Sequence, residues 1–258
     1  MRQHTRLRLL CCAGALALLA GCAAPGHDGA GSEAAMTAQS KLRLAKAAED
    51  TGNHDMAAAM YGAAAAAAPG NNDVQLHAAE GLARNGKLPE AETLLDKRLQ
   101  AAPDDVEMRR ALGGVEILTG HPQQAVDTFS RVLAVKADDL RAMTNMGVAL
   151  DMLHRYADAQ ALYRKALAAA PNDPAICNDL ALSLMQTGRL AEARQVLEPF
   201  RNAGDVPERI GINLGLLDAA SGQVELAQPA LAHVKSDDLT ALTQAIRQES
   251  GGQTTQVR

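Results

Sequence analysis

The stretch Leu140–Pro171, LRAMTNMGVALDMLHRYADAQALYRKALAAAP, decides the fold. It contains two runs rich in alanine and leucine, which favour helices. His154 and Arg155 separate the runs, and Pro171 follows the second run, where it cannot continue a helix. The stretch therefore predicts two helices joined by a tight turn, with helix A over 140–153 and helix B over 156–169.

The same pattern recurs along the chain with a period of 34 residues. Small residues in the middle of helix A stand at Ala45, Ala79, Gly113, Gly147, Ala181 and Gly215. The turns carry Gly52, Gly86, Gly120, His154, Gly188 and Gly222. Helix B carries alanine at Ala57, Ala91, Ala125, Ala159, Ala193 and Ala227. Bulky apolar residues follow these alanines at Tyr61, Leu95, Phe129, Tyr163, Leu197 and Leu231. The small residues allow the two helices to approach closely, and glycine permits the positive φ of a tight turn.

This pattern resembles the tetratricopeptide repeat, a helix-turn-helix unit of the same period. The resemblance implies an all-α, right-handed solenoid of six units, over residues 38–71, 72–105, 106–139, 140–173, 174–207 and 208–235. His154 replaces the turn glycine of unit four, which is tolerated because histidine is enriched at positive φ. Pro199 should leave helix B of unit five short or kinked, and Pro229 lies inside helix B of unit six.

Residues 1–22, MRQHTRLRLLCCAGALALLAGC, have the features of an export signal. A basic start precedes an apolar run, Leu9–Ala20, that is shorter than the roughly 20 apolar residues of a membrane span. The sequence LAGC at its end resembles the lipobox of bacterial lipoproteins, which implies removal of residues 1–21 and covalent lipid on Cys22. Ala23, in place of an aspartate, implies the periplasmic face of the outer membrane. The alternative is an ordinary signal peptide in which Cys22 is merely small and apolar.

The segments before and after the repeats lack the 34-residue pattern. Residues 22–37 are small and polar, which predicts a flexible tether between the lipid and the solenoid. Residues 236–249 are a candidate capping helix, with Ser236 or Asp237 as its N-cap. Residues 250–258 are expected to be a disordered tail.

The composition argues against several classes of function. Aromatic residues make up 2% of the chain, and its 25 basic residues are outnumbered by 30 acidic ones. Nucleic acid is therefore not expected as a ligand. The histidines are dispersed, and no motif predicts a catalytic residue, a metal site or a small-molecule substrate. Cys177 lies in an apolar helical stripe and is interpreted as a core residue. No cofactor is expected beyond the lipid on Cys22.

What remains is a binding surface on the A helices, which line the inner face of this fold. In units one and two the residues expected there are charged, among them Lys46, Glu49, Glu80 and Arg84. In units three to six the predicted partner-binding groove is formed by Ile117, Leu118, Val148, Met152, Asn178, Leu182, Met185, Ile212 and Leu216. An apolar strip of this kind indicates a peptide or helix as the partner. The alternative is that a C-terminal helix of the same chain covers part of the groove.

A more specific resemblance covers residues 140–217. The stretches Met143–Tyr156, Ala161–Leu167, Asn178–Leu184 and Val196–Phe200 resemble the repeat lipoprotein of tight-adherence (Tad, Flp pilus) systems, the TadD type. This resemblance implies a scaffold in pilus assembly at the outer membrane, with other proteins of the pilus or secretion apparatus as partners and the secretin as the first candidate. The alternatives are a pilotin of type IV pili, another envelope-assembly lipoprotein, or an enzyme whose site the sequence does not reveal.

Overall fold

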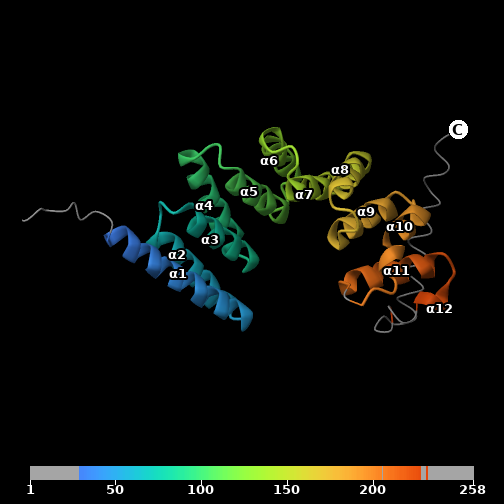
Figure 1. Cartoon of the computed structure of the whole chain (residues 1–258), viewed down its shortest axis with the longest axis horizontal. Helices are drawn as coiled ribbons and strands as arrows, with labels where there is room; N and C mark the ends of the chain where they lie inside the picture. The colour runs from blue at the N-terminus through green and yellow to red at the C-terminus, as the bar shows by residue number, and fades with distance from the viewer. Residues whose placement is uncertain (1–28, 205, 228–230, 232–258) are drawn as a thin grey trace, which may run out of the picture.

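The computed structural model describes residues 29–204, 206–227 and 231, with side chains from Thr37 onward except at residues 224 and 225. Within these residues every regular element is a helix. The helices form successive antiparallel pairs along an arched array (Figure 1). The A helices are α1 (Gly29–Asp50), α3 (Asn72–Arg84), α5 (Val106–Leu118), α7 (Leu140–Met152), α9 (Pro174–Gln186) and α11 (Glu208–Ala220). The B helices are α2 (His54–Ala67), α4 (Leu88–Ala101), α6 (Pro122–Val135), α8 (Tyr156–Ala169), α10 (Leu190–Leu197) and α12 (Val224–Ala227). The expectation of an all-helical repeat solenoid is confirmed.

The sequence explains where the helices start. Helices α3, α5, α7, α9 and α11 begin at the residues that the 34-residue period gives as the starts of units two to six. The Asp105 and Asp139 carboxylates cap α5 and α7, accepting bonds of 2.9 Å from the backbone N–H of Met108 and Ala142. Aspartate suits this place because it satisfies free backbone N–H groups and faces the positive end of the helix dipole.

The turns also follow the repeat pattern. Gly52, Gly86, Gly120, Gly188 and Gly222 all have positive φ, between 70° and 81°. His154 takes the same conformation with φ 58°, as its place in the period predicts. Its ring Nδ1 lies 2.7 Å from the hydroxyl of Tyr156, so the residue that replaces the glycine also makes a contact of its own.

The core consists of the residues that recur at fixed positions. All six helix-B alanines are fully buried, and the bulky residues that follow them are at most 3% exposed. A β-carbon built on Gly147 would lie 2.5 Å from the ring of Tyr163, and one built on Gly113 would lie 2.6 Å from the ring of Phe129. The small residue of helix A is therefore required by the aromatic ring that helix B packs against it.

The second helix of unit five is shorter than in the regular repeat. Helix α10 ends at Leu197 and a 3-10 turn, η1 (Glu198–Phe200), follows it, as Pro199 predicts. Arg194 and Arg201 from this region both pair with the fully buried carboxylate of Asp218 on α11, which ties unit five to unit six.

The first helix starts earlier than expected. Helix α1 begins at Gly29, inside the segment 22–37 that the sequence analysis interprets as a tether, so that boundary is corrected. Residues 32–40, SEAAMTAQS, contain no proline, and extending an existing helix costs far less than starting one. The signal peptide, Cys22, the candidate capping helix and the tail lie outside the described residues.

Candidate functional site on the inner face

The inner face of the array is built by the A helices. Each A helix from α1 to α9 contacts the A helix of the next unit. Each B helix from α2 to α10 packs against two A helices, that of its own unit and that of the next unit. Figure 1 accordingly shows α3, α5, α7 and α9 on the inner side of the arch and α4, α6 and α8 on the outer side. The periodic sequence thus places one row of side chains per A helix on a shared surface, here called the inner groove.

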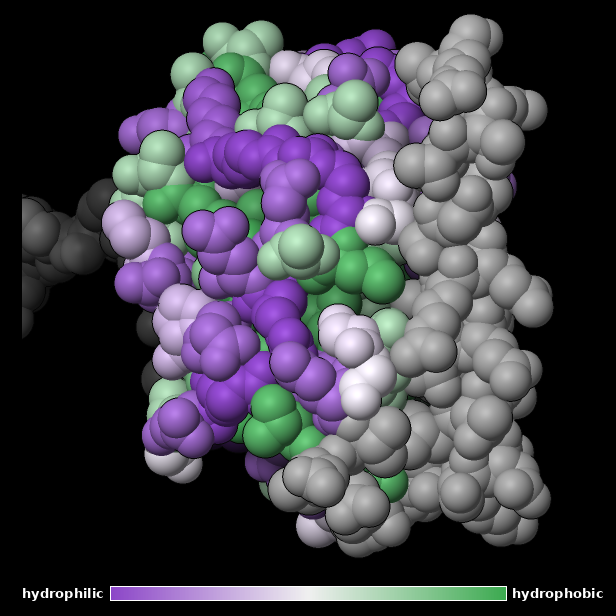
Figure 2. Space-filling model, turned by 90° about the vertical axis from the view of Figure 1, so that its right-hand side faces the viewer, coloured by the Kyte–Doolittle hydropathy of each residue, from purple (hydrophilic) through white to green (hydrophobic). Residues whose placement is uncertain are grey.

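Four predicted groove residues are exposed. They are Leu118 on α5, Met152 on α7, Leu182 on α9 and Ile212 on α11, with exposed fractions between 37% and 61%. Each comes from a different, consecutive A helix. Viewed from the C-terminal end, the surface shows hydrophobic residues set among hydrophilic ones (Figure 2). Large apolar side chains left in solvent on consecutive helices are typical of a surface that binds another protein.

The other predicted groove residues are less exposed to solvent. Ile117, Val148 and Met185 are half-buried and pack against the central core, and Leu216 packs against Ala219, Ala227 and Leu231. Asn178 does not face a partner. It is 3% exposed, and its side-chain oxygen accepts a 2.8 Å bond from Asn213 of α11. This corrects the prediction for Asn178, which links two repeats, because the hydrogen-bonding partner comes from the next unit and no sequence period reveals it.

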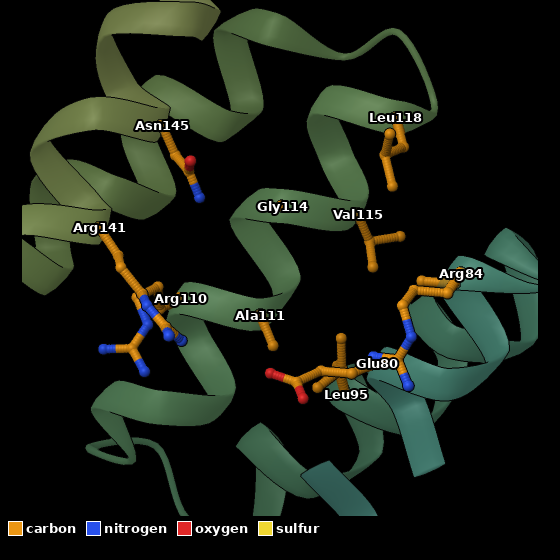
Figure 3. Close-up of a pocket in the computed structure, with 11 residues that line it drawn as sticks. Glu80, Arg84, Leu95, Arg110, Ala111, Gly114, Val115, Leu118, Arg141 and Asn145 are labelled. Atoms are coloured by element: carbon orange, nitrogen blue, oxygen red, sulfur yellow. The ribbon is translucent and has the colours of Figure 1, made fainter. Parts of the chain in front are cut away.

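A first cavity, of about 400 Å³, opens between α3, α5 and α7. Figure 3 shows Arg110, Arg141, Glu80 and Arg84 among the residues that line this cavity. Arg110 donates to the capping carboxylate of Asp139 at 2.7 Å, so that guanidinium is already paired. The apolar part of the wall includes Val115 and Leu118.

Lys46, Glu49 and Arg84, three of the charged residues predicted for units one and two, form ion pairs within the chain. Arg84 donates to Glu49 at 2.8 Å, and the Tyr61 hydroxyl donates to the same carboxylate at 2.7 Å. The hydrogen bond from Arg84 is the main cause that lowers the pKa of Glu49 to about 2. Lys46 pairs with Asp50 at 2.6 Å. These ion pairs lie within α1 and between α1 and α3, so the exposed apolar residues are the better candidate for partner binding.

A second cavity, also of about 400 Å³, lies between α7 and α9. Its apolar wall contains Val148, Met152 and Leu182, all predicted groove residues. Two carboxylates that the sequence analysis did not single out, Asp151 and Asp179, line the same cavity, here called the acidic pocket. Burial is the main cause that raises the pKa of both. The signal that could have found Asp151 is its spacing of 12 residues before Tyr163, which matches that of Glu49 and Tyr61.

The described residues offer little other chemistry. Cys177 is a free, buried thiol whose pKa is raised by burial, which confirms its interpretation as a core residue. Within the described ranges no group of three or more histidine, cysteine, aspartate or glutamate side chains is placed to hold a metal ion. In the same ranges, no helix combines the length and the apolar character needed to cross a bilayer.

Comparison with known proteins gives the family of the repeats. Family models described as tetratricopeptide repeat match residues 48–113, 119–174 and 152–210, which together make up more than half of the chain. Uncharacterized protein y4yS of Sinorhizobium fredii is 33% identical over 98 residues, covering 38% of this chain and 54% of that protein. Protein POLLENLESS 3 of Arabidopsis thaliana is 23% identical over 203 residues, covering 68% of this chain and 45% of that protein. The chain spans about half the length of these two relatives.

Two known structures share the fold. PilW, described as a widely conserved type IV pilus biogenesis factor, is 20% identical with a TM-score of 0.66, covering 80% of this chain and 98% of that chain. PilF of Pseudomonas aeruginosa is 16% identical with a TM-score of 0.61, covering 86% of this chain and 99% of that chain. At this level of identity the likeness establishes the arrangement of helices and nothing finer.

Proposed function

Because the chain belongs to the tetratricopeptide-repeat family, we propose that it is a scaffold that binds a segment of another protein along its inner groove and does not catalyse a reaction. The observation that carries this proposal is the row of exposed apolar side chains, Leu118, Met152, Leu182 and Ile212, on four consecutive A helices. A partner helix or extended segment with apolar residues at matching intervals would remove all four from water. Each such side chain is worth roughly 1.5–3 kcal/mol when fully buried.

We further propose that the scaffold works in the assembly of a tight-adherence pilus or a related secretion machine, with the secretin as the first candidate partner. Three observations support this: the resemblance over residues 140–217, the lipobox ending at Cys22, and the shared fold with the pilus biogenesis factor PilW. Lipid on Cys22 would anchor the solenoid to the outer membrane, facing the periplasm. A pilotin-like role in type IV pili is the alternative that the likeness to PilW and PilF keeps open.

The groove is tested with the double variant Met152→Asp, Leu182→Asp. Both side chains are exposed, so carboxylates there stay hydrated and cost the fold little. Against an apolar partner the same carboxylates would be desolvated without a mate, which costs several kcal/mol and lowers affinity by about 100-fold or more. We expect an unchanged melting temperature of the purified protein and loss of the secretin from its co-purified partners.

The matched control is Met56→Asp with Val135→Asp, two exposed apolar residues at the start of α2 and the end of α6, on the B-helix side of the array. It adds the same two charges and should keep the partner. Retention of the secretin by the groove variant, at an unchanged melting temperature, would show that the inner groove does not bind it.

The anchor is tested separately with Cys22→Ser. Without the thiol no diacylglyceryl group can be attached, so the protein should lose incorporated palmitate and leave the outer-membrane fraction. Cys12→Ser, which changes a cysteine inside the signal, should keep both. Palmitate labelling and membrane fractionation measure the outcome, and a Cys22→Ser protein that is still labelled and still in the outer membrane would overturn the lipobox interpretation.

A further inference from the structure

The acidic pocket between units four and five combines apolar walls with two carboxylates. Val148, Met152 and Leu182 form the wall, and Asp151 of α7 and Asp179 of α9 supply the charges. Tyr156 and His154 also line the pocket, with their rings edge to face at a centroid distance of 5.7 Å. An apolar partner alone would cover the two acidic groups without forming an ion pair with either of them.

The chain contains its own comparison for this pocket. In unit one, Glu49 accepts a bond from Tyr61, which follows 12 residues later, and it is neutralised by Arg84, 35 residues further along than Glu49. In unit four, Asp151 accepts a bond from Tyr163, again 12 residues later. The position 35 residues after Asp151 is occupied by Gln186, which lines the pocket and carries no charge. The same arrangement therefore occurs twice, once with its cation and once without it.

The neighbours of the two carboxylates leave room for a cation. The Oδ1 atom of Asp151 accepts a 2.7 Å bond from Ser183, and Oδ2 accepts a 3.0 Å bond from Tyr163, both neutral donors. Each oxygen keeps a second lone pair for another donor. Asp179 has only a long contact of 3.5 Å from Asn178, and Arg209, the cation that acts on it electrostatically, forms no ion pair with it among the described residues.

We propose that the acidic pocket receives a lysine or arginine side chain of the bound partner, whose cation lies between Asp151 and Asp179. The inference rests on the proposed function, because it specifies what the partner presents to the groove. The aliphatic stem of a basic side chain packs well on an apolar wall while its charged end reaches polar groups. The aromatic ring of Tyr156, which lines the same pocket and is only half-buried, adds a surface that suits a cation.

The energetics favour this occupant over an apolar one. Burial raises the pKa of Asp151 and Asp179, so covering the pocket with apolar groups would desolvate the two carboxylates further. A partner cation instead forms charge-assisted hydrogen bonds in a place where water screens them less than at an open surface. The partner segment we infer is therefore apolar along the groove, with one basic residue facing units four and five.

The test uses the full chain in lipid nanodiscs as bait for a random library of displayed linear peptides. Peptides are kept only if they bind the native protein and fail to bind a Met152→Ser, Leu182→Ser variant, which removes the apolar wall without adding charge beside Asp151 and Asp179, so that the groove is the site. We expect these peptides to share a lysine or arginine next to apolar residues. On Asp151→Asn, Asp179→Asn, their affinity should fall about 10- to 100-fold, the worth of a charged hydrogen-bonded pair.

Two further variants separate this pairing from general effects of charge. Asp96→Asn with Asp127→Asn removes the same charge from exposed positions on α4 and α6, and it should leave the affinity unchanged. Gln186→Arg should supply the missing internal cation, as Arg84 does for Glu49, and should lower the affinity as the double asparagine variant does while the protein stays folded.

The possible outcomes distinguish a failure of the cation pocket from a failure of the proposed binding groove. Groove-binding peptides without a basic residue, or with an affinity that the asparagine variant leaves unchanged, would overturn the cation pocket and keep the groove. Peptides whose free N-terminal amine, not a side chain, carries the effect would overturn the choice of a basic side chain. A library that yields no peptide dependent on Met152 and Leu182 would overturn the groove itself.

Discussion

At the scale of single residues, the same acid and tyrosine pair serves two purposes in two repeats. Glu49 is bonded to Arg84 and Tyr61, and its pKa falls to about 2 mainly because of the Arg84 hydrogen bond. Asp151 has only neutral donors, and burial raises its pKa above the ordinary value of 3.8. One carboxylate therefore stabilises the fold at neutral pH and the other destabilises it.

Substitution by the matching amide should reveal these opposite signs. The ion pair of Glu49 stabilises the protein above the ordinary pKa of 4.5, and this contribution is lost as the pH falls towards about 2. Glu49→Gln should therefore lower the melting temperature at neutral pH, with a difference that shrinks in acid. The cost of the charged Asp151 is present at neutral pH and disappears as the pH falls through its raised pKa towards 3.8.

Asp151→Asn should consequently raise the melting temperature at neutral pH and lose that advantage on acidification. Thermal melts followed by circular dichroism, from neutral pH down to about pH 2, compare both variants with the native protein. Two variants that shift the melting temperature in the same direction at neutral pH would contradict the assignment of a missing cation beside Asp151.

Residues on the inner face were only partly predictable from the sequence. Repeat position correctly placed Met152 and Leu182 in the open, because their exposure depends on the helix they belong to. The same reasoning failed for Asn178, whose burial depends on Asn213 in the next unit. The repeat pattern also failed to single out Asp151. Asp151 matters because Gln186 occupies the position where unit two has Arg84, and this difference becomes visible only when the two repeats are compared in space.

At the scale of elements, the close approach of helix A to helix B determines which residues the repeat accepts. Gly113 and Gly114 are neighbours in α5, yet only Gly113 faces the ring of Phe129. A β-carbon on Gly113 would lie 2.6 Å from that ring, whereas one on Gly114 would meet nothing within 4 Å. The two positions form a matched pair that separates packing from helix propensity.

Gly113→Ala should destabilise the protein by about 1–3 kcal/mol, because the phenyl ring is buried and cannot move aside. Gly114→Ala should stabilise it by up to about 1 kcal/mol, the advantage of alanine over glycine inside a helix. Melting temperatures of the two variants measure the difference. Equal effects at both positions would mean that α5 and α6 are further apart than the structure places them.

The helix boundaries show what local sequence can determine. The turn glycines and Pro199 act within a few residues of where they stand, so the sequence predicted the helix ends that they determine. The aspartate caps of α5 and α7 act over the same short range. The start of α1 at Gly29 depends instead on a helix already formed downstream, and small residues without a stop signal let that helix extend. Composition alone therefore suggested a tether where the chain is helical.

At the scale of the whole molecule, the repeats give a surface that no single unit could form. Each unit contributes one A helix, and the exposed side chains of Leu118, Met152, Leu182 and Ile212 come from four successive A helices, α5, α7, α9 and α11. The period of 34 residues predicted this architecture because each unit repeats the same packing contacts. The identity of the partner was not predictable in this way, because it depends on the exposed residues, which the packing does not constrain.

We propose that the inner groove, and not the outer face, contacts the partner in the cell. The most direct test places a photo-crosslinking amino acid at Met152 or Leu182 and, as a control, at the exposed outer residues Arg131 and Lys165 of α6 and α8. Illumination of cells that assemble the pilus should link the two groove positions to the secretin or another protein of the apparatus, and the outer positions should give no such product. A product from the outer positions with none from Met152 and Leu182 would contradict the account.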